Sequence, residues 1–177
     1  MGESMRCHAK FFIEITAILA PAVWALSQPQ GTQKPVPYAI SISTERGSYR
    51  AGQDIRLEVS LTNTSSQKAI VGRVNGDAQG ELSGYLLDAY DEKGTVPPLT
   101  YYYRVVRGEM PSDGMFMSHR LVTLAPGDRL KEVIIASKLY DLKAPGKYRL
   151  QVRREDPGSK AVVKSNTITV TVTSAGP

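Results

Sequence analysis

The fold of this chain is decided by the stretch LAPGDRLKEVIIASKLYDLKAPGKYRLQVRREDPGSKAVVKSNTITVTV at residues 124–172. Polar and apolar residues alternate strictly in two of its segments, KYRLQV at 147–152 and NTITVTV at 166–172. Pro-Gly pairs lie upstream of both segments and supply turns. Strict alternation between turns is typical of strands that have one face in a core and the other in solvent. The stretch therefore predicts the end of an antiparallel β-sandwich.

The same two-residue period extends the prediction toward the N-terminus. Its clearest example is the segment IRLEVSLT at 55–62, in which Val59 lies on the apolar face. Further strands are predicted at 38–43, 69–74, 85–90, 101–106, 119–124 and 130–136. An Asn-Gly pair at 75–76 indicates a tight turn. About eight or nine strands with turns between them, and no helix outside the N-terminal region, predict an all-β sandwich.

The first 27 residues have the pattern of a secretory signal peptide. Arg6 and Lys10 precede a largely apolar run at 11–26, and Ala25 and Ser27 are small residues at a cleavage position. Glu14 interrupts the run, so an uncleaved anchor or a buried helix remains an alternative. We expect a signal peptide at 1–27, a flexible leader at 28–37 and one domain at 38–174. The mature protein would be secreted or periplasmic and would have no membrane span.

Charge and cysteine content narrow the possible partners. Cys7 is the only cysteine and precedes the apolar run, so the mature chain would have no disulfide. The formal net charge is +5. Residues 75–113 have three basic and seven acidic side chains (−4), whereas residues 129–164 have ten basic and four acidic ones (+6). These blocks could pair with each other, or the basic one could bind an anionic cell-surface polymer. No nucleic-acid-binding motif accompanies them.

The segment GKYRL at 146–150 resembles the start of strand F in immunoglobulin-like domains. Tyr148 matches the tyrosine of that strand, and Leu150 occupies the position of its cysteine. The resemblance implies that Tyr148 is buried and that its hydroxyl bonds to nearby backbone. The cysteine pair is missing, and so is the core tryptophan, because Trp24 lies in the predicted signal peptide. The wider pattern resembles secreted bacterial immunoglobulin-like domains of unassigned function. It is distantly similar to the sandwich domain that precedes the catalytic domain of deuterolysin-class metalloendopeptidases.

No residue pattern predicts catalysis, a bound metal or a cofactor. His119 is the only histidine after the predicted signal, so a zinc motif of the His-Glu-x-x-His type is absent. A nucleophile elbow and a phosphate-binding glycine loop are absent as well. Asp88, Asp91 and Glu92 cluster at a turn, but their spacing is not that of a calcium loop. A solvated hairpin is the simpler explanation for these carboxylates.

The segment YYYRVVR at 101–107 is the predicted binding patch. On a strand, Tyr101 and Tyr103 would point to one face, and Tyr102 and Arg104 to the other. All of them cannot enter one core, and Tyr and Arg are enriched at binding hot spots. Arg107 would extend the patch. The alternative is that the irregular segment at 108–117 covers the rings.

Three functions remain open at this point. The first is a secreted, non-catalytic β-sandwich that binds a protein or a cell-surface polymer. The second is an inhibitory or accessory domain for a secreted protease, which only the endopeptidase resemblance implies. The third is a small enzyme with an unfamiliar site, in which His119 would be essential. We expect the first.

Overall fold

The computed structural model describes residues 36–75, 84–111 and 118–175. The predicted signal peptide, most of the leader, the turn at Gly76 and residues 112–117 lie outside this part of the chain. The described elements are β1 (Tyr38–Thr44), β2 (Ser48–Arg50), β3 (Arg56–Asn63), β4 (Ala69–Asn75), β5 (Tyr85–Tyr90), α1 (Tyr101–Val106), β6 (Ser118–Leu124), β7 (Arg129–Ile135), α2 (Ala136–Leu139), β8 (Gly146–Glu155) and β9 (Val162–Thr173). The predicted all-β class is therefore confirmed.

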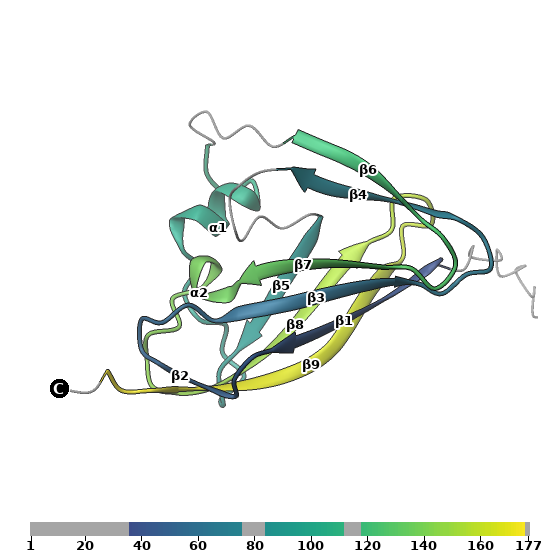
Figure 1. Cartoon of the computed structure of the whole chain (residues 1–177). Coiled ribbons are helices and arrows are strands. Elements are labelled where there is room, and N and C mark those ends of the chain that lie inside the picture. The colour runs from purple at the N-terminus through teal and green to yellow at the C-terminus, as the bar shows by residue number, and fades with distance from the viewer. Residues whose placement is uncertain (1–35, 76–83, 112–117, 176–177) are drawn as a thin grey trace, which may run out of the picture. The chain divides into compact units, whose positions relative to one another are not determined.

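The strands form an immunoglobulin-like sandwich and a separate two-stranded sheet. One sheet has the order β1-β3-β7, and the facing sheet has the order β2-β9-β8-β5. Figure 1 shows the first sheet lying across the second, with β4 and β6 beside them as a two-stranded sheet. All pairings are antiparallel except that of the short β2 with β9. The antiparallel sandwich predicted from the two-residue period is what the structure shows.

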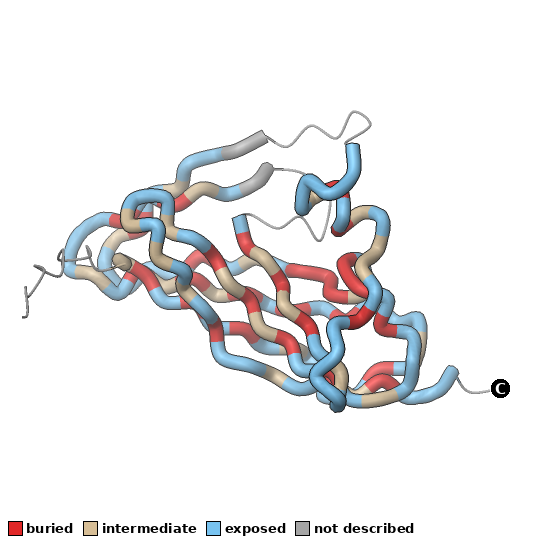
Figure 2. Tube along the Cα trace, turned by 180° about the vertical axis from the view of Figure 1, so that it is seen from behind, coloured by how far each residue is buried: buried red, intermediate tan, exposed pale blue. Residues whose placement is uncertain are grey.

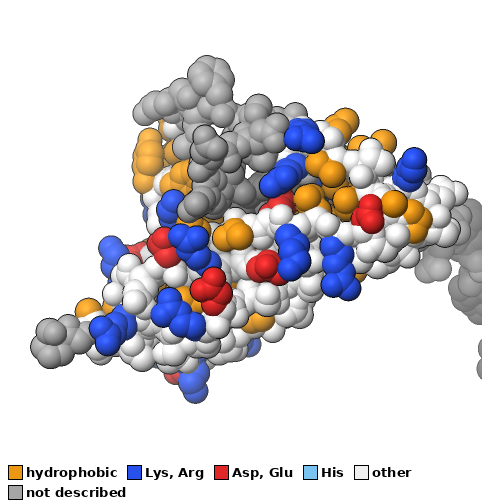
Figure 3. Space-filling model, in the orientation of Figure 1, with side chains coloured by type: hydrophobic (Ala, Val, Ile, Leu, Met, Phe, Trp, Pro, Cys, Tyr) orange, Lys and Arg blue, Asp and Glu red, His pale blue; other side chains and the backbone are white. Residues whose placement is uncertain are grey.

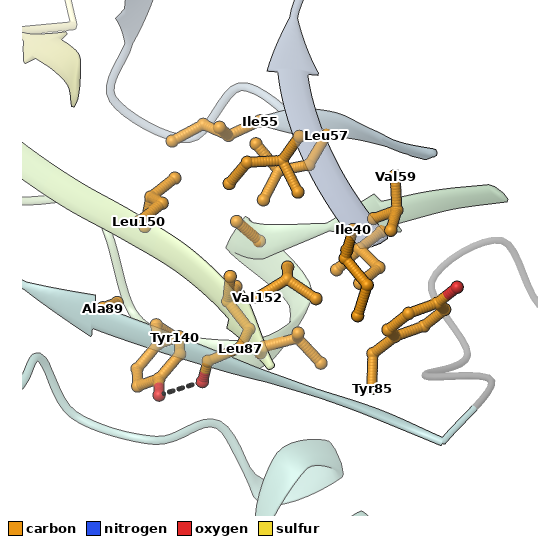
Figure 4. Packing of buried hydrophobic residues seen from close by; sticks show 14 of the residues in the cluster. Ile40, Ile55, Leu57, Val59, Tyr85, Leu87, Ala89, Tyr140, Leu150 and Val152 are labelled. Carbon is orange, nitrogen blue, oxygen red and sulfur yellow. Dashed lines mark hydrogen bonds between the residues drawn. The ribbon is translucent and has the colours of Figure 1, made fainter. Parts of the chain in front are cut away.

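Burial alternates along the strands as the sequence predicts. In Figure 2, buried and exposed positions follow one another along the paired strands. In β3, the side chains of Leu57, Val59 and Leu61 point into the core, and the residues between them do not. In β8, Tyr148, Leu150 and Val152 do the same from the facing sheet. The two inner faces meet in one apolar core, part of which Figure 4 shows.

Tyr148 lies where the immunoglobulin-like resemblance places it. Its ring is buried, and its hydroxyl donates a hydrogen bond to the backbone oxygen of Ala144, 2.7 Å away. Burial raises the pKa of the Tyr148 hydroxyl. Leu150, in the position of the missing cysteine, has no exposed surface and packs in the core. The packed side chain of Leu150 thus occupies the position at which antibody-type domains have a disulfide-bonded cysteine.

The prediction that no helix lies outside the N-terminal region is wrong. The segment expected to be a strand at 101–106 forms α1, and a second short helix, α2, follows β7 directly. Both helices lie at the same end of the sandwich (Figure 1). Within the described residues, no helix has the length and apolar character that crossing a membrane requires.

Candidate functional site

The predicted patch lies on α1, whose start is fixed by a capping threonine. The side-chain oxygen of Thr100 accepts a hydrogen bond from the backbone N–H of Tyr103 (3.2 Å), as an N-cap residue does. The Thr100 hydroxyl also donates to the backbone oxygen of Lys138 in α2 (2.6 Å), and the Thr100 N–H bonds to that of Leu139 (2.9 Å). These bonds tie the first turn of α1 to α2.

Tyr103 anchors α1 in the core. Its side chain has no exposed surface. Its hydroxyl accepts a hydrogen bond from the N–H of Leu87 in β5 (3.0 Å) and donates one to the backbone oxygen of the same residue (2.9 Å). The Tyr140 hydroxyl also donates to this oxygen (2.7 Å), a bond drawn in Figure 4. The Tyr103 and Tyr140 rings meet edge to face at 5.3 Å, and burial raises the pKa of both hydroxyls.

The helix separates the three tyrosines in a way that the strand prediction did not. That prediction placed Tyr101 and Tyr103 on the same face. Instead, Tyr103 is buried, Tyr101 is 58% exposed and Tyr102 is half-buried. Successive helical residues are about 100° apart, because one turn has 3.6 residues, so the two-residue alternation of a strand does not apply. Only Tyr101 presents a largely exposed ring.

The exposed side of α1 combines one aromatic ring with positive charge. Arg104 is exposed and lies three residues after Tyr101, on the same side of the helix. Arg107 is also exposed, but its Nε is held 2.8 Å from a carboxylate oxygen of Glu109, and its guanidinium lies 5.7 Å from the centre of the Tyr103 ring. Met110 is 38% exposed just beyond the helix. Figure 3 shows apolar side chains at the surface over α1. The arrangement is suited to recognition.

Sequence reasoning missed a polar cluster at the opposite end of the inner faces. Arg154 in β8 is only 5% exposed, although it is charged. Its Nη2 donates to the backbone oxygen of Gly72 in β4 (2.9 Å). Its guanidinium lies 5.1 Å from the Tyr85 ring centre and 6.0 Å from that of Tyr38. Glu132 of β7, whose side chain is 8% exposed, forms an ion pair with Arg73 of β4 (3.4 Å).

The chemistry of this cluster is consistent with a structural role. Burial raises the pKa of Tyr38 to about 12 and raises that of Tyr85 as well. Arg154 lowers the pKa of both hydroxyls, but this effect is smaller than the increase caused by burial. Tyrosines that stay protonated and a buried arginine do not supply an acid or a base near neutral pH. The cluster therefore attaches β4 to the sandwich.

No metal-binding group is found in the part of the chain that the structure describes. It contains no group of three or more His, Cys, Asp or Glu side chains that could hold a metal ion. Asp91 accepts hydrogen bonds from the backbone N–H groups of Lys93 (2.9 Å) and Thr95 (2.7 Å), so its carboxylate shapes the turn. Asp88 forms an ion pair with Arg153 (2.9 Å), which joins the acidic and basic blocks of the sequence. The side chain of His119 is not among those that the structure describes.

Comparison with known proteins gives little guidance on function. No protein-family model matches the chain, and no curated protein matches it. Solved structures that resemble it include β-glucosidases from Erythrobacter marinus (TM-score 0.37, 13% identity, 77% of this chain and 16% of that one) and Listeria innocua (0.38, 14%, 78% and 16%). Another is the β-D-glucoside glucohydrolase from Trichoderma reesei (0.35, 12%, 77% and 18%). The chain spans less than a fifth of each enzyme, and such low similarity supports no inference about activity.

Proposed function

We propose that this protein is a secreted, non-catalytic β-sandwich module that binds a partner protein through the exposed side of α1. The observation that carries the proposal is the difference between Tyr103 and Tyr101, which are two positions apart in α1. Tyr103 fixes the helix by its buried ring and by two hydrogen bonds to Leu87, while Tyr101 projects into solvent. A rigid base beneath an exposed aromatic side chain lowers the entropy cost of binding.

The composition of this surface favours a protein as partner. Tyr and Arg are enriched among the residues that dominate protein–protein binding energies, and Met adapts to apolar surfaces. Tyr101, Arg104 and Met110 supply these side chain types at one end of the sandwich. Binding of an anionic cell-surface polymer would instead need a broad basic surface, and Arg107 is already paired with Glu109. A polymer is therefore the alternative outcome of the test.

The test compares two Tyr–Arg pairs by the same pull-down from the envelope fraction and the same denaturant melt. The α1 variant carries Tyr101→Ala and Arg104→Ala. The control carries Tyr90→Ala and Arg149→Ala, an exposed cross-strand pair on β5 and β8. We expect the α1 variant to lose a protein partner that the control retains. Both should unfold within about 1 kcal/mol of the parent, because exposed side chains contribute little to folding.

Three results would contradict the proposal. If both variants retained the partner, the exposed side of α1 would not be the binding surface. If the parent bound only a soluble polyanion, and the α1 variant lost that binding, the partner would be a polymer and not a protein. Loss of several kcal/mol in the α1 variant would show that these side chains belong to the core.

The secreted location rests on the sequence at 1–27 and has its own test. We expect the exported protein to begin near Gln28, because small residues at 25 and 27 mark the cleavage position. Intact-mass measurement of the exported protein checks this expectation. A full-length chain that stays in the cytoplasm would contradict it.

A further inference from the structure

The strand edges of this protein are not equally protected. Exposed edges present unpaired N–H and C=O groups, which another chain can bind by adding a strand. In β1, the side-chain amide of Asn166 bonds both backbone groups of Ile42, at 2.8 and 3.0 Å. In β5, the Tyr103 hydroxyl does the same for Leu87. At the edge strand β7, the side chain of Glu132 forms an ion pair with Arg73 of β4.

The outer edge of β6 has no such protection among the described residues. β6 pairs only with β4 in a two-stranded sheet, so its other edge is not part of a ladder. No side chain of the described part bonds to the backbone of residues 120–123. With respect to the described residues, the outer edge of β6 is thus unpaired over a length that a short extended peptide would match.

The exposed face of β4 and β6 is apolar. Leu121 is 73% exposed and Ile70 is 68% exposed, the two highest values among the large apolar side chains of the described part. Leu121 lies opposite Gly72, which has no side chain to cover it, and Ile70 lies opposite Thr123. A strand added to β6 would bring its own side chains beside Leu121, at the spacing of neighbouring strands.

The charge of β4 and β6 indicates which kind of peptide segment would bind at the β6 edge. The segments 68–75 and 118–124 contain Lys68, Arg73 and Arg120 and have no acidic residue. Arg73 is paired with Glu132, whereas Lys68 and Arg120 are exposed. Pairing of β6 with a second copy would bring like charges together across the new ladder, which is destabilising. An extended segment with alternating carboxylates and aliphatic side chains would complement both the arginine and the leucine.

We propose that the outer edge of β6 binds an extended acidic segment of a partner protein by strand addition. Main-chain hydrogen bonds to β6 hold the segment, Arg120 pairs with a carboxylate, and Leu121 packs against an aliphatic side chain. This site is separate from the exposed side of α1 and is carried by different observations. Each of the two proposals can therefore fail without the other.

The experiment uses the full chain and three synthetic peptides, with binding measured by isothermal titration calorimetry. The first peptide alternates Glu and Val, the second alternates Lys and Val, and the third is the first with N-methyl groups on every residue. We expect the Glu-Val peptide to bind at least about tenfold more tightly than the other two. The Lys-Val peptide is repelled by Arg120, and the N-methyl groups remove the N–H donors that strand addition needs.

Variants then locate the binding at β6. Arg120→Glu should weaken the Glu-Val peptide at least about tenfold and strengthen the Lys-Val peptide, because the charge pair is reversed. Arg149→Glu, on the exposed side of β8, is the matched control and should change neither affinity. A thermal melt of each variant shows that the fold is retained.

Three outcomes would overturn the proposal. Equal loss of affinity in Arg120→Glu and Arg149→Glu would mean that net charge alone attracts the peptide. Equal binding of the methylated peptide would exclude strand addition. A concentration-dependent dimer that Arg120→Glu abolishes would show that the occupant is a second copy of this chain.

Discussion

The edges of the sandwich and the edge of β6 are built in opposite ways. In β1 and β5, one polar side chain bonds both backbone groups of a single edge residue, Ile42 or Leu87. Beside β6, the described residues provide no such bond, and Leu121 is largely exposed. Each of these two edge strands thus has one residue whose backbone groups are closed to another strand, while the described residues leave the outer edge of β6 unpaired. Natural proteins usually protect exposed strand edges, so an edge that the described residues leave unprotected is informative.

The contrast also separates residues that fold the protein from residues that can bind. Tyr103 and Tyr101 are two positions apart and have opposite roles, since one closes the β5 edge and the other is exposed. The largest effect is expected here. Tyr103→Ala should lower the free energy of unfolding by about 3–5 kcal/mol, because a large buried ring leaves a cavity. Tyr101→Ala should change it by less than about 0.5 kcal/mol.

Denaturant melts of the two variants check this difference. Equal losses would mean that the two tyrosines share one role and that α1 has no separate binding side.

Alkaline pH should weaken the sandwich through its buried tyrosine hydroxyls. The pKa of Tyr38 is about 10 in an unfolded chain, and burial raises it to about 12 in the folded protein. Between these values the unfolded chain has lost the proton and the folded one keeps it, so rising pH favours unfolding. The stability that depends on the protonated hydroxyl is present below about pH 10 and is lost as pH approaches 12.

The size of this loss follows from the shift in pKa. Each unit of pKa corresponds to about 1.4 kcal/mol, so Tyr38 alone accounts for about 2–3 kcal/mol. Burial also raises the pKa of Tyr85, Tyr103 and Tyr140, which adds to the loss. Urea melts across this pH range measure it, and Tyr38→Phe should reduce it. A stability that stays constant up to pH 12 would contradict the burial of these hydroxyls.

The hydroxyl of Tyr103 can be tested apart from its ring. Tyr103→Phe should cost about 1–2 kcal/mol, because the buried N–H of Leu87 loses its partner. The backbone oxygen of Leu87 keeps the bond from Tyr140, which limits the loss. A denaturant melt gives the change, and Tyr140→Phe is the matched control, since it removes one bond to the same oxygen and leaves the N–H paired. A larger loss in the control would assign the β5 edge mainly to Tyr140.

Much of the fold follows from the two-residue period. The segments at 55–62, 147–152 and 166–172 form β3 and parts of β8 and β9, and the apolar positions of each are on the inner face. The pairing of β4 with β6 is not visible in the sequence, because it joins segments about fifty residues apart and leaves only weak periodicity in either.

The helix α1 was missed because tyrosine and valine favour strands. The capping signal of Thr100 was present, but the helix owes its stability to tertiary contacts of Tyr103, which the sequence does not reveal.

Arg154 was missed for a different reason. The inward period of Leu150 and Val152 continues to Arg154, and that of Leu130 and Ile134 includes Glu132. A charged residue in phase with the core is therefore a signal that could have found this cluster.

The smallest effect on stability is expected at the exposed face of β4 and β6. Ile70→Thr and Leu121→Thr should each change the free energy of unfolding by less than about 0.5 kcal/mol, because both side chains are largely exposed and Thr keeps a high strand propensity. Val71→Thr, on the buried side of β4, is the control and should cost more. Chemical melts compare the three. A loss above 1 kcal/mol at Leu121 would show that this face is covered.

The contrast between closed and open edges is tested most directly by native-state hydrogen exchange of individual amides. The N–H groups of Ile42 and Leu87 lie at strand edges but donate to Asn166 and Tyr103. We predict that both exchange at least about tenfold more slowly than the outward-facing amides of β6, and that Tyr103→Phe accelerates Leu87 alone. Exchange at Ile42 and Leu87 as fast as at the β6 edge would contradict the account.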